Sequence, residues 1–196
     1  MEFNMETLSK VKNLNSKKLV FASKTPKFPP KVAYTLLEIA QKVNPIKDTI
    51  YDPFCGNGTI LIMAGLNFKD QLKHFYGSDI NQEAVESTQL NLATYSALSD
   101  EEILSQIMPL DCTNQFPHNL DGTKTVIVTD PPFGRRCKLL PGTLERAFNS
   151  FQRNRVTDLS FCFDDKTILP EGLSEHYRIK EVYNNWNRAF YIAKIK

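Results

Sequence analysis

Short apolar segments with the composition of β-strands alternate along this chain with longer segments of helical periodicity. The predicted strands are residues 49–51, 74–80, 107–112, 125–129 and 159–163, and the predicted helices are residues 32–43, 59–67, 82–97 and 143–152. Such alternation is typical of a parallel sheet, because a crossover helix returns the chain to the end of the sheet where the next strand begins. The sequence therefore predicts the α/β class.

The end of the chain departs from this alternation. Residues 177–183 and 186–195 have strand composition and are separated by Asn184 and Asn185. Asparagine is favoured in tight turns, so this segment is predicted to be a β-hairpin. The length of 196 residues fits one domain. We expect a basic arm or cap over residues 1–26 and a single domain over residues 27–196.

Composition limits the classes of protein that this chain can belong to. No apolar run is long enough for a membrane helix, and the N-terminus lacks the layout of a signal peptide. Four cysteines are scattered without a C-x-x-C pair, which disfavours a metal site and favours reduced thiols: Cys55, Cys112, Cys137 and Cys162. We therefore expect a cytoplasmic protein without a metal or a membrane partner.

A glycine-containing loop follows the first predicted strand. Residues 52–59 have the sequence Asp-Pro-Phe-Cys-Gly-Asn-Gly-Thr, and in an open α/β sheet ligands bind beyond the carboxyl ends of the strands. Gly56 and Gly58 allow the backbone to turn tightly beside a ligand. Asp79 ends the second strand, about 20 residues later, where a carboxylate can accept hydrogen bonds from ribose hydroxyls. The alternative is an ordinary strand–turn–helix corner.

The loop does not match the common nucleotide-binding motifs. A dinucleotide motif requires a third glycine where Leu61 stands, and the Gly-Lys-Ser/Thr of a Walker loop is absent. With Asp79, the loop instead resembles that of the class I S-adenosylmethionine-dependent methyltransferases, and the resemblance extends from about Lys27 to Lys196. It implies a Rossmann-like, seven-stranded sheet that is mostly parallel, with a C-terminal antiparallel hairpin and helices on both faces.

The same resemblance implies a set of residues around the cofactor S-adenosylmethionine. Its methionine part would lie against the loop, Asp79 would hold the ribose and Ile80 would pack beside the adenine. Asp111 and the backbone of Cys112 would reach the adenine amine. The loop residues that the resemblance assigns to the cofactor are Asp52, Pro53, Phe54, Cys55, Gly56, Gly58 and Thr59.

A second motif, Asp130-Pro131-Pro132-Phe133, follows the predicted strand at residues 125–129. An exocyclic base amine is a poor nucleophile because its lone pair is delocalised into the ring. The Asp130 carboxylate and the Pro131 carbonyl can accept hydrogen bonds from both N–H groups, and consecutive prolines expose carbonyls without competing donors. Phe133 can stack on a base that has left its helix. The alternative is a plain β-turn after a strand.

This motif resembles the (Asp/Asn)-Pro-Pro-(Tyr/Phe) signature of amino-methyltransferases. The run Asp-Pro-Pro-Phe-Gly-Arg is most similar to guanine-N2 RNA methyltransferases, although Phe133 replaces their usual tyrosine and loses its hydroxyl. The resemblance implies methyl transfer to an exocyclic amine in RNA, preferentially guanine N2 in rRNA or tRNA. A DNA adenine-N6 methyltransferase and a non-catalytic RNA-binding protein of the same fold remain alternatives.

Basic residues are concentrated in two segments, although the net charge is only +2. Residues 10–31 contain lysines and no acid, and a second basic group follows the Asp-Pro-Pro-Phe motif. For any single lysine, a solvated surface is the simpler explanation. Two basic segments beside the predicted site favour a phosphate-bearing partner such as RNA. The residues predicted to contact RNA are Lys27, Arg135, Arg136 and Lys138.

Overall fold

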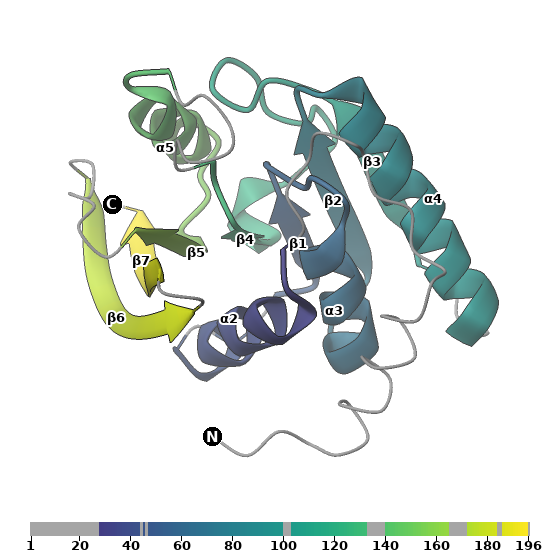
Figure 1. Cartoon of the computed structure of the whole chain (residues 1–196). Coiled ribbons are helices and arrows are strands. Elements are labelled where there is room, and N and C mark those ends of the chain that lie inside the picture. Colours follow the sequence, from purple (N-terminus) through teal and green to yellow (C-terminus); the bar gives the residue numbers. More distant parts are fainter. Residues whose placement is uncertain are drawn as a thin grey trace.

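A seven-stranded sheet forms the centre of the protein, with the strand order β3-β2-β1-β4-β5-β7-β6 (Figure 1). The computed structural model describes residues 28–43, 45, 47–99, 103–132, 140–164, 172–183 and 186–195. Strands β1 to β5 are parallel, and β7 runs antiparallel between β5 and β6. The strands are β1 (Thr49–Asp52), β2 (His74–Asp79), β3 (Ser105–Pro109), β4 (Thr125–Thr129), β5 (Asp158–Asp164), β6 (Leu173–Tyr183) and β7 (Trp186–Ile195).

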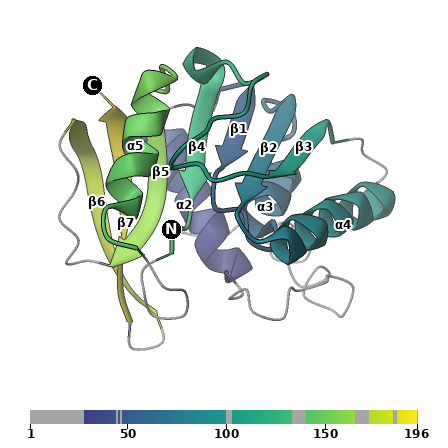
Figure 2. The same ribbon diagram turned by 90° about the horizontal axis from the view of Figure 1, so that it is seen from above.

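Helices cover both faces of this sheet. The helices are α2 (Pro30–Val43), α3 (Thr59–Phe68), α4 (Gln82–Ser99) and α5 (Thr143–Arg153), with a 3-10 turn at Gly122–Lys124. Helices α2 and α3 pack on one face, and α5 packs on the other (Figure 2). The predicted α/β class, with a mostly parallel sheet and a C-terminal antiparallel pair, is therefore confirmed.

Alternation along each strand divides the core into two clusters. Ile50 of β1 packs with α2 and α3, whereas the next residue, Tyr51, packs in the cluster that contains α5. Successive side chains of a strand point to opposite faces, so each central strand contributes to both clusters. Phe161 of β5 and Tyr191 of β7 stack with their ring centroids 5.0 Å apart, which joins the parallel part of the sheet to the hairpin.

Several predicted strand boundaries were wrong, and two of them were wrong by three residues or more. The third strand ends at Pro109 and not at Cys112, because the Asp111 side chain accepts the backbone N–H of Thr113 and turns the chain. The hairpin's first strand begins at Leu173, earlier than predicted. Asn184 and Asn185, and the predicted arm at residues 1–26, lie outside the described residues. Within the described part of the chain, no helix has the length and apolarity needed to span a bilayer.

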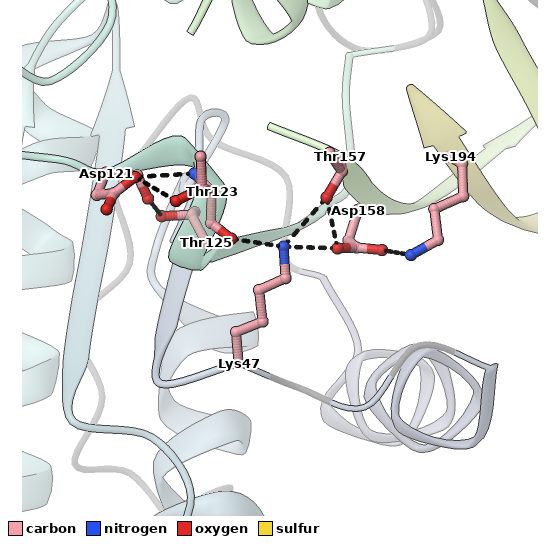
Figure 3. Close-up of polar contacts among 7 residues, drawn as sticks. All are labelled: Lys47, Asp121, Thr123, Thr125, Thr157, Asp158 and Lys194. Carbon is pink, nitrogen blue, oxygen red and sulfur yellow. Dashed lines mark hydrogen bonds and ion pairs between the residues drawn. The ribbon is translucent and has the colours of Figure 1, made fainter. Parts of the chain in front are cut away.

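A buried carboxylate joins several elements at the amino-terminal end of β5. Asp158 is only 4% exposed. It forms ion pairs with Lys47, at 2.7 Å, and with Lys194 of β7, and it accepts a hydrogen bond from Thr157 (Figure 3). Lys47 also donates to the Thr123 carbonyl at 2.9 Å. The cluster therefore links the chain before β1, the turn before β4, and strands β5 and β7.

The ion pairs determine the protonation state of Asp158. Burial raises its pKa, but hydrogen bonds from Lys194, Lys47 and Thr157, together with the charge of Lys47, outweigh burial and hold the pKa below its ordinary value. A carboxyl whose pKa is lower in the folded state stabilises the fold above its unfolded pKa. That contribution is lost as the pH falls through the folded pKa.

We predict that Asp158→Asn lowers the free energy of unfolding by about 1–3 kcal/mol near neutral pH, because the amide cannot pair with two ammonium groups. Urea unfolding across pH should show the gap to wild type closing as the medium is acidified below the ordinary aspartate pKa. Asp70→Asn, at an exposed position after α3, is the matched control. A gap that does not depend on pH would contradict the role of the ion pairs.

Candidate active site

The glycine loop lies at the carboxyl end of β1 and is fixed by backbone hydrogen bonds to the neighbouring strand. Cys55 N–H donates to the Ser78 carbonyl at 2.9 Å, and Gly56 N–H donates to Asp79 Oδ2 at 3.1 Å. On its other side, the Gly56 carbonyl accepts a hydrogen bond from the Thr88 hydroxyl of α4 at 2.8 Å. Strand β2 and helix α4 therefore hold the loop in one conformation.

Gly58 is required where this loop enters α3. Its φ of 78° lies in the left-handed region, which side chains other than glycine rarely adopt. A Cβ at this position would also lie 2.9 Å from Cγ2 of Thr88. The next residue of α4 that contacts the loop is Asn91, whose Nδ2 donates to the Asn57 carbonyl at 3.0 Å. Close approach of α4 thus depends on a glycine in the loop.

Asp79 and Ile80 lie at the end of β2, beside the loop. Asp79 Oδ1 accepts from the Asn81 N–H at 2.9 Å, and its other oxygen accepts from Gly56. Burial raises the pKa of this half-buried carboxyl. Ile80 is 79% exposed, which is unusual for a large apolar side chain next to a buried strand. A carboxylate acceptor beside an apolar surface has the chemistry that a ribose and an adenine ring require.

Asp111 and Cys112 follow β3. The Leu110 N–H donates to the Asp79 carbonyl at 3.1 Å, which holds this segment beside the end of β2. Asp111 is half-buried, and its carboxylate accepts hydrogen bonds from Thr113 and Asn114 that close the turn. Cys112 is 2% exposed and packs in the core cluster of α5, and burial raises the pKa of its thiol. The turn that contains Asp111 therefore follows directly after the end of β3 beside β2, and the Cys112 side chain packs in the core.

Asp52 differs from the other acidic residues of the site, because its carboxylate lies inside the protein. It is 1% exposed, and its Oδ1 accepts hydrogen bonds from the Thr129 hydroxyl at 2.7 Å and from the Phe54 N–H at 3.2 Å. Burial raises the pKa of Asp52 to about 7, although both hydrogen bonds lower it. This carboxylate could therefore affect a bound cofactor only indirectly, through the conformation of the loop.

The remaining loop residues differ in exposure. Pro53 and Cys55 are buried, and Phe54 and Thr59 are half-buried. Burial raises the pKa of the Cys55 thiol well above its ordinary value, so Cys55 is uncharged at neutral pH. These side chains shape the loop, and its backbone is the part that can approach a ligand.

The proline motif begins directly after β4. Asp130 and Pro132 are half-buried and Pro131 is buried. Because β1 and β4 are parallel neighbours, with Tyr51 paired to Ile127, the glycine loop and Asp130 begin at the same edge of the sheet. The predicted residues Phe133, Arg135, Arg136, Lys138 and Lys27 lie outside the described residues. The structure thus brings the ends of β1, β2, β3 and β4 together.

Several residues that support this site were missed in the sequence. They are buried polar side chains that bind the loop or the end of β4, and none belongs to a recognisable motif: Ser78, Thr88, Asn91 and Thr129. Thr88 and Asn91 carry a usable signal, since polar residues three positions apart on the inner face of a helix require a partner. Ser78 and Thr129 resemble ordinary strand residues.

The sheet order and the loop after β1 define a class I methyltransferase fold. A family model described as "RMKL-like, methyltransferase domain" matches residues 21–158, and the chain belongs to this family.

Curated relatives support this assignment. The tRNA (guanine(10)-N2)-dimethyltransferase of Methanothermobacter thermautotrophicus is 36% identical over 143 residues, which are 70% of this chain and 39% of the relative. The Methanothermococcus thermolithotrophicus protein named "Probable tRNA (guanine(10)-N2)-dimethyltransferase" is 37% identical over 75% of this chain and 88% of its own length. The chain thus spans well under two thirds of the first relative and most of the second.

Solved structures support the fold. The rRNA methyltransferase AviRa of Streptomyces viridochromogenes superposes with a TM-score of 0.68 at 17% identity, over 94% of this chain and 92% of that one. The magnesium protoporphyrin IX methyltransferase of Synechocystis, solved with bound S-adenosylmethionine, gives a TM-score of 0.62 at 13% identity, over 98% and 91% of the two chains. Substrates as different as these indicate that the shared fold does not determine the methyl acceptor.

We predict that Asp52→Asn removes the part of the pH dependence of stability that comes from the titration of Asp52. The folded pKa of Asp52 is raised to about 7, so the wild-type fold should lose up to about 4 kcal/mol from this group as the pH rises from about 4 to about 7. Urea unfolding of both proteins across this range should show the difference. Parallel stability curves would contradict the assigned protonation.

A second prediction concerns cofactor binding. Asp79→Ala should weaken binding of S-adenosylhomocysteine by about 1–3 kcal/mol, as for hydrogen bonds lost to a buried polar partner. Calorimetry with Asp70→Ala as the control measures this. Tighter binding of NADH or ATP than of S-adenosylhomocysteine by the wild-type chain would show that the loop was assigned to the wrong ligand.

Proposed function

We propose that this chain transfers a methyl group from S-adenosylmethionine to the exocyclic N2 of guanine in tRNA. The observation that carries the proposal is the position of Asp130-Pro131 directly after β4. The glycine loop begins and strand β2 ends, at Asp79, at this same edge of the sheet. The names of the curated relatives support tRNA and guanine N2. The chain spans only part of the longer relative, so the proposal is limited to the chemistry of methyl transfer.

The cofactor pocket in this proposal is formed by the ends of three strands. The loop backbone would hold the methionine part, Asp79 the ribose and Ile80 the adenine face, with Asp111 as an acceptor for the adenine amine. The Asp79 carboxylate suits the ribose hydroxyls, the exposed Ile80 side chain suits the apolar face of the adenine, and the Asp111 carboxylate suits the adenine amine. When bound, S-adenosylmethionine supplies an electrophilic methyl group on a positively charged sulfur.

The chain's own residues would orient the acceptor. Guanine presents the N1–H and N2–H donors side by side, which a carboxylate such as Asp130 can accept together, and the Pro131 carbonyl can accept the second N2–H. These bonds would aim the N2 lone pair at the methyl carbon. N2 would form a bond to the methyl carbon that the bound cofactor supplies, in exchange for the carbon–sulfur bond, and would lose one proton to Asp130 or water. The acceleration comes from orientation more than from a strong base.

We predict that the wild-type chain methylates a tRNA transcript with guanine at position 10, and that changing this base to adenine abolishes transfer. Asp130→Ala should reduce the single-turnover rate by about a hundredfold or more, with S-adenosylhomocysteine affinity unchanged because Asp130 contacts the base. Asp70→Ala is the control. The measurement is methyl transfer followed by mass spectrometry of the nucleosides.

Three other results would point elsewhere. Methylated guanosine in rRNA but not in tRNA would change the substrate and keep the chemistry. N6-methyladenine in DNA would favour the alternative enzyme. Intact cofactor binding without transfer to any nucleic acid would favour a non-catalytic protein of this fold.

A further inference from the structure

We infer that Thr129 is a positioning residue for methyl transfer, which fixes the Asp130 motif against the glycine loop through the buried Asp52 carboxylate. The inference rests on the proposed function, because it assigns Thr129 a role in aligning the methyl acceptor with the cofactor. Asp52 belongs to the loop motif and Thr129 directly precedes the proline motif, but neither motif accounts for the hydrogen bond between these two side chains.

One carboxylate oxygen of Asp52 accepts both hydrogen bonds that form this link. Asp52 Oδ1 accepts both the Thr129 hydroxyl, at 2.7 Å, and the Phe54 N–H, at 3.2 Å. Thr129 is fully buried and Asp52 is 1% exposed, so water does not compete for these bonds. Thr129 directly precedes Asp130, and Phe54 belongs to the glycine loop. A single carboxylate oxygen therefore connects the segment that would hold the base to the loop that would hold the cofactor.

Backbone pairing does not provide this connection. The ladder between β1 and β4 pairs Thr49 with Thr125 and ends at Tyr51 and Ile127. Towards β5, in contrast, β4 remains paired as far as Thr129, which lies opposite Phe161. On the β1 side, the side-chain bond from Thr129 to Asp52 thus takes over where the main-chain bonds stop, at the end of the sheet where the chemistry would occur.

The choice of residues favours a positional role over simple packing. A buried carboxylate without a cationic partner costs free energy, and a valine in place of Thr129 would fill nearly the same volume without needing that carboxylate. In addition to burial, the charge of Asp79 raises the pKa of Asp52, and the charge of Asp52 in turn raises the pKa of Tyr51, Cys55 and Cys112. Among the residues that the structure describes, no cationic side chain pairs with Asp52, and the Thr129 hydroxyl and the Phe54 N–H are the donors that satisfy its Oδ1.

Strand β4 also contains a matched control. Thr125 lies at the opposite end of the strand, is likewise fully buried, and donates a 2.7 Å hydrogen bond to the Asp121 carbonyl. Thr125→Val and Thr129→Val therefore make the same chemical change in the same strand. They differ in whether the lost bond faces the proposed site.

The experiment compares single-turnover methyl transfer, cofactor affinity and stability in these variants. Thr129→Val should reduce the single-turnover rate by about tenfold to a hundredfold, as for a small misplacement of reacting groups. S-adenosylhomocysteine affinity should change by less than about threefold, a difference well below one decade. Thr129→Ser, which keeps the hydroxyl, should restore the rate, and Thr125→Val should retain it at a similar cost in stability.

The pH profile provides a readout that a purely structural role would not change. The hydrogen bond from Thr129 lowers the pKa of Asp52, which burial has raised to about 7. Removing the hydroxyl should therefore raise this pKa further and move the acidic limb of the rate profile to higher pH. Thr125→Val should leave this limb in place.

Two results would overturn the inference: equal rates for Thr129→Val and Thr125→Val, or a loss of cofactor affinity in Thr129→Val as large as the loss of rate. If the wild-type chain transfers no methyl group to tRNA, rRNA or DNA, the proposed function fails, and amide hydrogen exchange decides the inference instead. Faster exchange of peptides covering residues 52–59 in Thr129→Val, but not in Thr125→Val, would support the link. Unchanged exchange would refute it.

Discussion

Parallel pairing of β1 with β2 and β4 is the constraint on which the rest of this structure depends. Parallel strands have all their carboxyl ends at one edge of the sheet, so the loops that follow them meet there even though they are far apart in the sequence. Asp79, Asp111 and Asp130 lie at the same edge of the sheet as the glycine loop for this reason. The polar bonds at this edge then fix positions that the topology only brings near one another.

The parts of the fold that the sequence revealed are those with local signals. Strand 125–129 was predicted with its observed bounds, because a fully buried strand is a short run of β-formers between turns. The third strand was misplaced, because a side-chain bond from Asp111 ends it and no periodicity encodes that bond. The order of the strands in the sheet was likewise not predicted, since it depends on packing between distant segments.

The same distinction applies to the site. Gly56, Gly58 and Asp79 could be found because their spacing along the chain is itself the motif. Thr129 could not, because a threonine in a strand is unremarkable until the fold places Asp52 at 2.7 Å from its hydroxyl. The fold therefore completes the site with residues whose roles exist only in three dimensions.

Two buried carboxylates at opposite ends of the sheet show how differently the protein treats charge. Asp158 is paired with two lysines, and its pKa is lowered. Asp52 receives hydrogen bonds from a hydroxyl and an amide, and its pKa is raised to about 7. The first arrangement stabilises the ionised form, as suits a structural link. The second leaves a carboxyl poorly solvated and poised to titrate. Strongly perturbed groups of that kind cluster at functional sites, where geometry is maintained at the expense of stability.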